Sequence, residues 1–321
     1  MTLEQKSRAI AAAMCATAAL GLRVNDAIVL HDSNKVTVRL LPCDTVARVA
    51  EERIGRWAEF EVELAQRLAE AESPIAALEP RVEPGAYVRD GFVVTLWTYY
   101  ESVPSREFAP VDYAQALERL HVCMKPIDFR TPHFTDRIAD AQRLVGSREQ
   151  TPELVDADRE LLSKTLRKMR QAISDRGAPE QLLHGEPHPG NVLRTKKGLM
   201  FIDLETRCRG PVEFDLAHVP EEVCQQYTSA HRQLLHECRI LMLGMVAAWR
   251  WDRNDQLPDG RQEARKFLTV LRAALSGAPS RPPLMALATP DDIVFHVHEA
   301  LNELEQPPRG GAGEGRLVKF S

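Results

Sequence analysis

The chain has 321 residues, 44% of them hydrophobic and 27% charged, which is enough apolar material for one large core or two smaller ones. Its formal net charge of -5 and its isoelectric point near 6.1 argue against binding to nucleic acid or to an anionic membrane through overall charge. The six cysteines are scattered and form no C-x-x-C pair. This spacing argues against a zinc ribbon or a disulfide framework and favours a reducing cytoplasm.

Residues 9–22 form a mostly alanine-rich apolar run that follows Lys6 and Arg8, as in a secretory signal. Because alanine is the strongest helix former, we expect a helix of the folded protein here, and secretion is the alternative. The most apolar stretch elsewhere, residues 240–249, is about half the length that a bilayer-spanning helix needs.

Three strand-like segments follow, at residues 26–30, 36–41 and 45–49, and short polar turns connect them. They predict a small antiparallel sheet. The first turn contains Ser33 and Asn34 but no glycine, so an ordinary solvated hairpin turn and a phosphate-binding loop are both compatible with it.

A helix is expected over residues 56–72, where Glu61 shares one helical face with Leu64 and Leu68. Glu61 should therefore point inward, and a buried carboxylate needs a cationic partner. Arg48, on the third predicted strand, is such a cation. Without further motifs, a stripe-edge carboxylate and a solvated strand arginine are the simpler interpretations.

A second strand pair is predicted at residues 86–89 and 92–96 around an Asp-Gly turn, and an aromatic segment with Tyr99 comes directly after it. From residue 110 onward the pattern is helical. One stripe runs from Tyr113 to Met124, and further helices are expected over residues 158–176 and 229–251.

The segment at residues 183–193, Leu-His-Gly-Glu-Pro-His-Pro-Gly-Asn-Val-Leu, contains the chemistry expected of a phosphoryl-transfer site. Glu186 precedes Asn191 by five positions, which is the spacing of the base and the metal ligand in the protein-kinase catalytic loop. A predicted hairpin after Asn191 would return Asp203 to its side. Amide and carboxylate oxygens are hard ligands that suit Mg²⁺.

His184, Glu186 and His188 also alternate within this segment, so a zinc hydrolase is an alternative. Two histidines four residues apart bind zinc from one face of a helix, but Pro187 and Pro189 disfavour a helix here, and no third ligand is evident.

These residues resemble the signature of the aminoglycoside phosphotransferase and choline kinase family, a His-Gly-Asp-x-His-x-x-Asn loop followed by Ile-Asp. The segment Gly-Pro-Val-Glu-Phe-Asp-Leu-Ala at residues 210–217, the Ser-Asn-x-Val at residues 33–36 and Leu120-His121 are similar to further family motifs. The family usually has Asp where this chain has Glu186, whose carboxylate reaches about one bond length further.

The resemblance implies an α+β fold of two protein-kinase-like lobes. Residues 1–98 would form a small antiparallel N-terminal lobe with one main helix, and residues 99–305 a larger, mostly helical C-terminal lobe that contains the catalytic loop and the metal-binding hairpin. Residues 306–315 lack core-forming residues, and a flexible tail is expected over residues 306–321.

The resemblance also implies roles for individual residues. Glu186 would be the catalytic base, and Asn191 and Asp203 would bind the metal. The residues implied in nucleotide binding are Ser33, Asn34, Arg48, Glu61 and Tyr99. Those implied in structural support of the site are His184, His188 and Asp215.

The function implied is Mg²⁺-dependent transfer of the γ-phosphate of ATP or GTP to a hydroxyl group of an antibiotic or a metabolite, in the cytoplasm. The expected partners are a nucleoside triphosphate and a hydroxylated small molecule, with neither nucleic acid nor a membrane. The alternative is a kinase-like nucleotide-binding regulatory module with weak or no catalysis, which Glu186 and the glycine-free turn favour.

Overall fold

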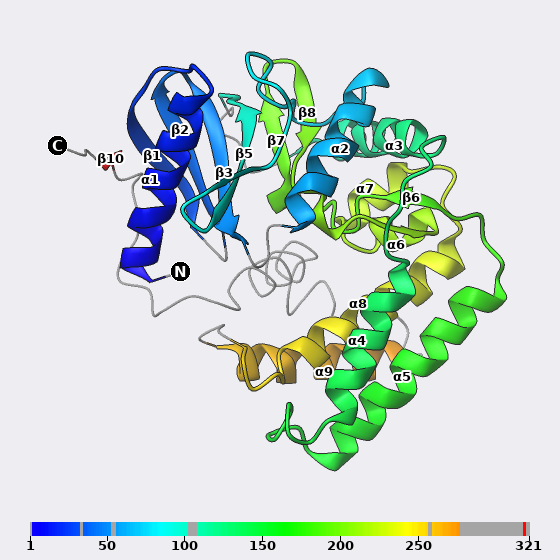
Figure 1. The fold of residues 1–321 in the computed structure, drawn as a ribbon. Coiled ribbons are helices and arrows are strands. Elements are labelled where there is room, and N and C mark those ends of the chain that lie inside the picture. Colours follow the sequence, from blue (N-terminus) through cyan, green and yellow to red (C-terminus); the bar gives the residue numbers. More distant parts are fainter. Residues whose placement is uncertain are drawn as a thin grey trace. The chain divides into compact units, whose positions relative to one another are not determined.

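A computed structural model describes residues 2–32, 35–52, 56–101, 108–255, 259–276 and 317–318. The chain divides into two compact units (Figure 1). Unit 1 comprises Met1–Ser105, Leu193–Glu205 and the strand at the C-terminal end, and unit 2 comprises Arg106–Val192 and the helices that follow Thr206. The lobe boundaries expected from the sequence stay a prediction, and nearly all of the expected flexible tail lies outside the described residues.

Unit 1 is built on a six-stranded antiparallel sheet with the strand order β10-β1-β2-β3-β5-β4. The strands are β1 (Val24–Asp32), β2 (Val36–Pro42), β3 (Thr45–Glu51), β4 (Tyr87–Arg89), β5 (Phe92–Thr98) and β10 (Leu317–Val318). The five strands predicted from the sequence are confirmed, and most are longer than predicted. The short strand β10 was not predicted, because its pairing with β1 joins opposite ends of the chain.

Helix α1 (Leu3–Ala19) packs against one face of this sheet (Figure 1). A capping box between Thr2 and Gln5 starts the helix. Its small buried side chains, such as Ala9 and Ala13, lie against Val38 and other β2 and β3 residues that alternate along their strands. The alanine-rich run is therefore a core helix of this unit, as expected.

Side chains on the other sheet face include Arg48, since alternate residues of β3 point to opposite faces. Helix α2 (Arg56–Glu70) contacts β5 and presents a buried stripe that contains Leu64 and Leu68. Glu61 lies in this stripe with only 2% exposure, so the prediction that it points inward is confirmed.

The hairpin of β7 (Val192–Thr195) and β8 (Gly198–Phe201) follows the catalytic segment, as predicted. Its turn ends at Gly198, which has a φ of +115°. Backbone hydrogen bonds connect the end of β8 to the segment after α2: Phe201 N donates to Pro74 O at 2.8 Å, and Ala76 N donates to Phe201 O at 3.0 Å. These bonds position the residues that follow Phe201 within unit 1.

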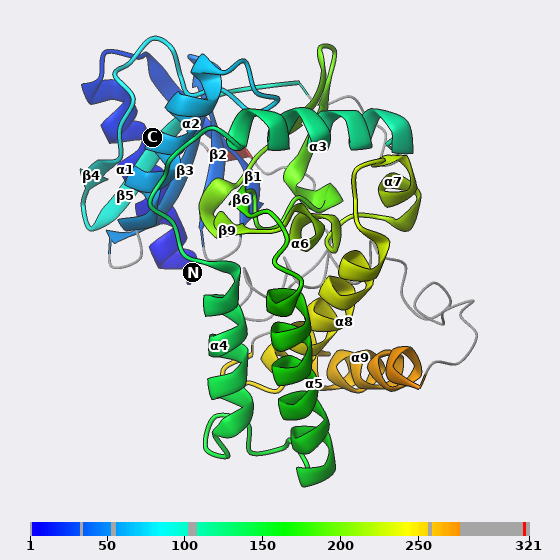
Figure 2. The same cartoon turned by 90° about the vertical axis from the view of Figure 1, so that its right-hand side faces the viewer.

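Unit 2 is mostly helical. Its helices are α3 (Pro110–Met124), α4 (Phe134–Gly146), α5 (Asp156–Asp175), α6 (Val212–Leu216), α7 (Glu221–Gln226), α8 (Arg232–Trp249) and α9 (Gly260–Leu275). Helices α4, α5 and α8 lie side by side (Figure 2). The helices predicted at α3, α5 and α8 are confirmed; α8 begins later than predicted because His231 caps it by accepting a hydrogen bond from Leu234 N. Helices α4, α6, α7 and α9 were not predicted.

A small strand pair holds the catalytic segment. Strand β6 (Gln181–Leu183) pairs with β9 (Cys208–Gly210), and an isolated bridge connects Arg209 to His133, the N-cap of α4. The catalytic loop begins directly after β6. Strand β6 precedes the loop, and β9 follows the Asp203 segment. Their pairing therefore fixes the position where the loop begins.

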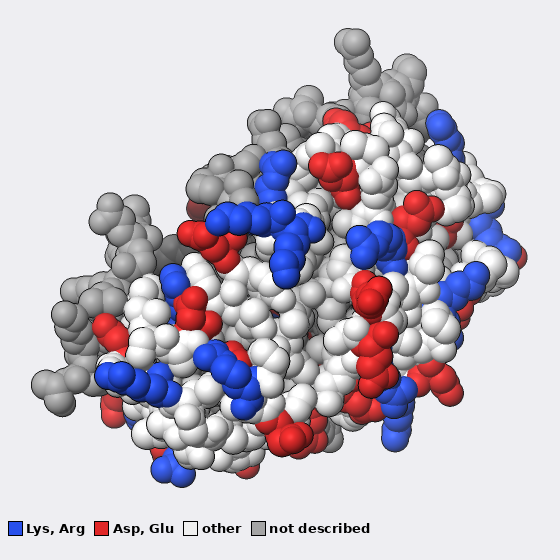
Figure 3. Space-filling model, turned by 90° about the horizontal axis from the view of Figure 1, so that it is seen from above, with Lys and Arg blue, Asp and Glu red and all other residues white. Residues whose placement is uncertain are grey.

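Among the residues that the structure describes, no helix combines the length and the hydropathy needed to cross a membrane. On the face drawn in Figure 3, acidic and basic side chains are interspersed with uncharged ones. This distribution agrees with the small net charge of the chain.

Candidate active site

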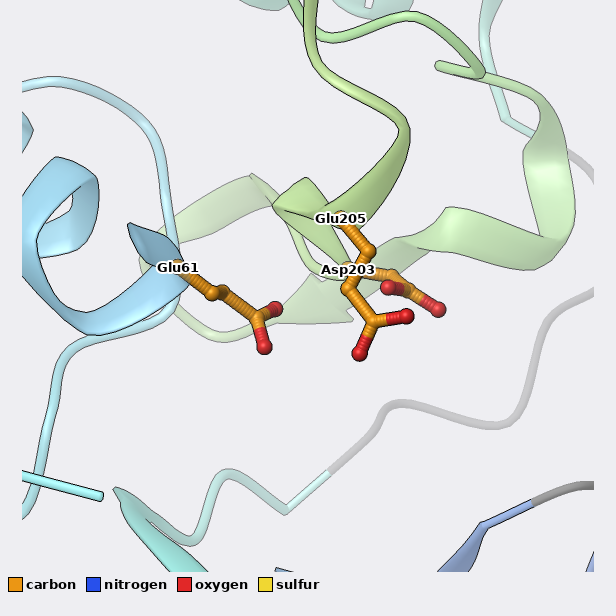
Figure 4. A group of neighbouring side chains, drawn as sticks. All are labelled: Glu61, Asp203 and Glu205. Atoms are coloured by element: carbon orange, nitrogen blue, oxygen red, sulfur yellow. The ribbon is translucent and has the colours of Figure 1, made fainter. Parts of the chain in front are cut away.

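Three carboxylates converge in unit 1 (Figure 4). Glu61 comes from α2, and Asp203 and Glu205 follow strand β8. One oxygen from each lies within 4.8 Å of the others. We call Glu61, Asp203 and Glu205 the acidic cluster.

Arg48 joins all three members of the acidic cluster. Its Nη1 donates to Glu61 Oε1, and its Nη2 lies 2.9 Å from Asp203 Oδ1 and 3.5 Å from Glu205 Oε1. The ion pair between Arg48 and Glu61 that the helical stripe predicts is therefore present. Burial opposes the charge of Arg48, but Asp203 and Glu61 outweigh it and raise the pKa of Arg48 further above its ordinary value.

Lys35, directly before β2, is a second cation at the acidic cluster. Its ammonium group forms an ion pair with Glu205 Oε1, and its side chain is 13% exposed. Burial lowers the pKa of Lys35, and the negative charge of Asp203 acts in the opposite direction. Two cations thus face three carboxylates.

Asp203 adopts a left-handed backbone conformation with a φ of +63°. Aspartate tolerates this region better than most residues. The conformation is supported one residue later, where Leu204 N donates to Glu61 Oε1 at 3.1 Å. Glu61 therefore orients the backbone at Asp203 as well as the Arg48 guanidinium.

The acidic cluster suits a hard divalent cation. All three donors are carboxylates, the ligand type that Mg²⁺ and Ca²⁺ prefer. Two basic side chains already lie on these oxygens, which shows that the cluster attracts positive charge. Asn191, the other predicted metal ligand, belongs to unit 2, and its sharing of one ion with Asp203 stays a prediction.

The remaining nucleotide-binding predictions are not tested by these contacts. Ser33 and Asn34 lie outside the described residues. Tyr99 follows β5, and the Arg39 guanidinium stacks over its ring at 3.7 Å from the centroid. Trp97, in the same aromatic segment, is a core residue with 7% exposure.

In unit 2, the predicted base Glu186 is almost fully buried. Its Oε1 accepts a hydrogen bond from Arg137 Nη2, and Arg137 Nη1 also donates to Gly185 O at 3.3 Å. The Arg137 guanidinium lies over the ring of Trp249. Arg137 thus holds both the side chain and the adjacent backbone of the predicted base.

The two loop histidines are hydrogen-bonded within the loop. His184 Nδ1 accepts from Glu186 N at 3.3 Å, and His188 Nδ1 accepts from Gly190 N at 3.1 Å. The Asn191 amide nitrogen donates to Glu186 O at 3.0 Å and lies 3.2 Å from His188 Nε2. The carboxamide oxygen of Asn191 is the atom that would bind a metal.

Asp215, on α6, holds the start of the catalytic loop. It accepts hydrogen bonds from His184 N at 2.9 Å and Gly185 N at 2.8 Å, and its Oδ2 lies 3.0 Å from His121 Nε2. His121 Nδ1 in turn lies 2.8 Å from the hydroxyl of Tyr227. Burial disfavours the charge of Asp215, but the bonds from His121 and Gly185 prevail and lower its pKa.

These contacts disfavour the zinc alternative. Residues 184–188 are a loop, followed by the 3₁₀ turn η2 (Pro189–Asn191), and not a helix. Within the described parts of the chain, the only group of His, Cys, Asp and Glu ligand atoms that converges is the acidic cluster.

Sequence reasoning missed Lys35 and Arg137. Lys35 is the unspecified position of the Ser-Asn-x-Val motif, and a turn has no periodicity from which the direction of its side chain could be predicted. Arg137 occupies the edge of the α4 stripe between Phe134 and Ala141, so helical spacing held a signal, but no motif marked it.

Replacing Gly185 by alanine should destabilise unit 2 by about 3 kcal/mol. Gly185 has a φ of +92°, and an added Cβ would lie 1.9 Å from the backbone oxygen of Thr206. Urea unfolding measures the loss. Gly177→Ala is the matched control, because its φ of +55° is also left-handed but nothing lies within 4 Å of the new Cβ. Equal losses for the two variants would show that the clash is absorbed without cost.

Asp215→Asn should lower the free energy of unfolding at pH 7 by about 2 kcal/mol, because a buried charged acceptor is lost. The folded-state pKa of Asp215 lies below its ordinary value of 3.8. Its stabilising effect is therefore complete above that pH and is lost as the pH falls further. Urea unfolding at pH 7 and between pH 3 and 4 should show the difference narrowing only in the acid range. A constant difference would mean that the charge does not stabilise the loop.

Three comparisons with known proteins bear on this geometry. A family model described as the phosphotransferase enzyme family matches residues 36–238. No curated protein matched the chain. The solved structures that resemble it share its α+β protein-kinase-like fold.

A choline/ethanolamine kinase family protein from Mesorhizobium loti aligns with a TM-score of 0.62 and 17% identity, over 88% of this chain and 98% of its own. An amicoumacin kinase in complex with AMP-PNP, Ca²⁺ and its antibiotic aligns with a TM-score of 0.63 and 12% identity, over 84% and 96%. A GDP complex of an aminoglycoside 2′-phosphotransferase-IIIa variant aligns with a TM-score of 0.64 and 14% identity, over 87% and 100%.

The family match covers more than half of the chain, and the catalytic loop, the Asp203 segment and Asp215 all fall within it. The chain therefore belongs to the phosphotransferase enzyme family.

Proposed function

We propose that this phosphotransferase moves the γ-phosphate of ATP or GTP to a hydroxyl group of a small molecule with the help of Mg²⁺. The observation that carries the proposal is the contact of Arg48 with both Glu61 and Asp203 in unit 1. This arrangement combines the cation expected to hold the α- and β-phosphates, its carboxylate partner and a metal-ligand aspartate.

The protein groups have separate tasks in this proposal. Arg48, held by Glu61, binds nucleotide phosphates, and Asp203 with Asn191 binds Mg²⁺. When bound, Mg²⁺ would neutralise charge on the phosphates. Glu186 orients the acceptor hydroxyl and takes its proton.

Arg137 restrains Glu186, the residue at which the family usually has the shorter aspartate. A longer side chain has more freedom, but the hydrogen bond from Arg137 Nη2 restrains the Glu186 carboxylate. The second bond, to Gly185 O, restrains the backbone beneath it. Arg137 therefore limits the freedom that the longer stem of Glu186 would otherwise have.

The acceptor is a hydroxylated antibiotic or metabolite. Aminoglycosides, amicoumacin, choline and ethanolamine, named for proteins of similar fold, form the first panel. The acidic segment after Gly210 gives little support for a cationic acceptor. Asp215 supports the catalytic loop, Glu213 accepts a hydrogen bond from His231 N, and Glu221 pairs with Arg239.

Asp203→Asn should reduce turnover by about a hundredfold or more, because the substitution removes the charge of the proposed metal ligand. ADP or GDP release with Mg²⁺ measures this on whichever acceptor the panel identifies. Glu63→Gln is the control, since Glu63 lies on the outer face of α2 with 48% of its side chain exposed. Near-normal turnover of Asp203→Asn would contradict the assignment of the metal ligand.

Glu186→Gln should leave nucleotide affinity unchanged and reduce transfer by about a hundredfold to ten-thousandfold, since glutamine cannot take the hydroxyl proton. Its amide oxygen can still accept a hydrogen bond from Arg137, so the loop should keep its shape. Calorimetric titration with AMP-PNP and single-turnover transfer separate the two effects. Glu180→Gln is the control, since Glu180 is a carboxylate of unit 2 with 41% of its side chain exposed. Unchanged transfer would place the base elsewhere.

The same panel tests the regulatory alternative. A protein that binds AMP-PNP or a GTP analogue but transfers phosphate to none of the acceptors would be a nucleotide-binding module. Transfer to one acceptor at a turnover typical of kinases, about 1–100 s⁻¹, rules that module out.

A further inference from the structure

Lys35 interacts electrostatically with the three carboxylates of the acidic cluster. Its ammonium group pairs with Glu205 Oε1, which also lies 3.5 Å from Arg48 Nη2. Asp203 and Glu61 act on Lys35 electrostatically as well. Arg48 and Lys35 therefore neutralise most, but not all, of the charge of the three carboxylates.

A divalent cation would need the oxygens that these basic groups now contact. Mg²⁺ binds its oxygen ligands at about 2.0–2.1 Å and demands a regular octahedron around it. An ammonium group on the same Glu205 oxygen would repel the ion and obstruct that geometry. Lys35 and a metal thus compete for Glu205.

A nucleotide offers Lys35 another partner. Lys35 directly precedes β2, and it lies on the same Glu205 oxygen as Arg48, the cation proposed to hold the nucleotide phosphates. Lysine is a compact point charge on a flexible four-carbon stem, which suits phosphate binding and lets the ammonium group change partners. Arg48 is a planar guanidinium that contacts Glu61 and Asp203, and we expect it to stay in place.

We propose that Lys35 is a phosphate-binding residue that exchanges Glu205 for the phosphates of the nucleotide, so that nucleotide binding opens Glu205 to the metal. The exchange rests on the proposed function. It makes the two ligands cooperative, because each removes the obstacle to the other.

Lys35→Met tests the exchange through two affinities that should change in opposite directions. Without divalent metal, the affinity for AMP-PNP, or for a GTP analogue if the protein prefers GTP, should fall about tenfold, because one charged phosphate contact is lost. Without nucleotide, the affinity for Mn²⁺ should rise about tenfold, because a competing positive charge is removed. Isothermal titration calorimetry measures both quantities.

Matched variants isolate the effect. Lys196→Met removes another lysine of unit 1, which is 82% exposed and pairs with Glu101, and should change neither affinity. Lys35→Arg keeps the charge and should retain most of the nucleotide affinity. Thermal unfolding of each variant verifies that it is folded, and Lys35→Gln replaces Lys35→Met if the latter is not.

Weaker binding of both ligands, or unchanged metal binding, would show that Lys35 is only a structural partner of Glu205 and would overturn the exchange. These outcomes are independent of turnover. If the wild-type protein binds nucleotide and metal but transfers no phosphate, the proposed function fails while the titrations still decide the role of Lys35. If it binds neither ligand, both proposals fail.

Discussion

Neutralisation of the buried Glu61 and the partly buried Asp203 by Arg48 is the interaction on which unit 1 depends. Arg48 lies on β3, Glu61 on α2 and Asp203 beyond β8, so one guanidinium connects three separate segments. A buried carboxylate without a cation is costly, and removing one partner of such a pair typically costs about 3–5 kcal/mol. The sheet, the helix and the hairpin are therefore held in one arrangement by the charge that the proposed chemistry also needs.

In unit 2, a buried carboxylate is stabilised by backbone amides as well as by a side chain. Asp215 is fully buried and accepts hydrogen bonds from two consecutive backbone amides of the catalytic loop, and His121 supports it from α3. Gly185 allows this geometry because no side chain fits beside Thr206. Asp215 thus holds the start of the loop through the backbone amides of His184 and Gly185.

Basic residues at both sets of carboxylates explain how charged groups persist in the interior before any ligand binds. Arg137 accompanies Glu186, and Arg48 with Lys35 accompanies the acidic cluster. Each pairing lowers the cost of burying a carboxylate. Arg137 and Lys35 differ in the kind of side chain: Arg137 is a planar guanidinium fixed by two hydrogen bonds and an aromatic ring, whereas Lys35 is an ammonium group on a flexible four-carbon stem.

The sequence by itself determined five of the six strands of the sheet, the inward direction of Glu61 and the hairpin before Asp203, because these follow from local periodicity and turn chemistry. It also identified the catalytic segment, because the residues that define this segment lie close together in the sequence, at positions 183–193. Only the tertiary structure decided that Arg137 contacts Glu186 and that Lys35 contacts Glu205. Those partners are 49 and 170 positions apart. Which side chains meet across such separations is set by the packing of whole elements, which no local pattern specifies.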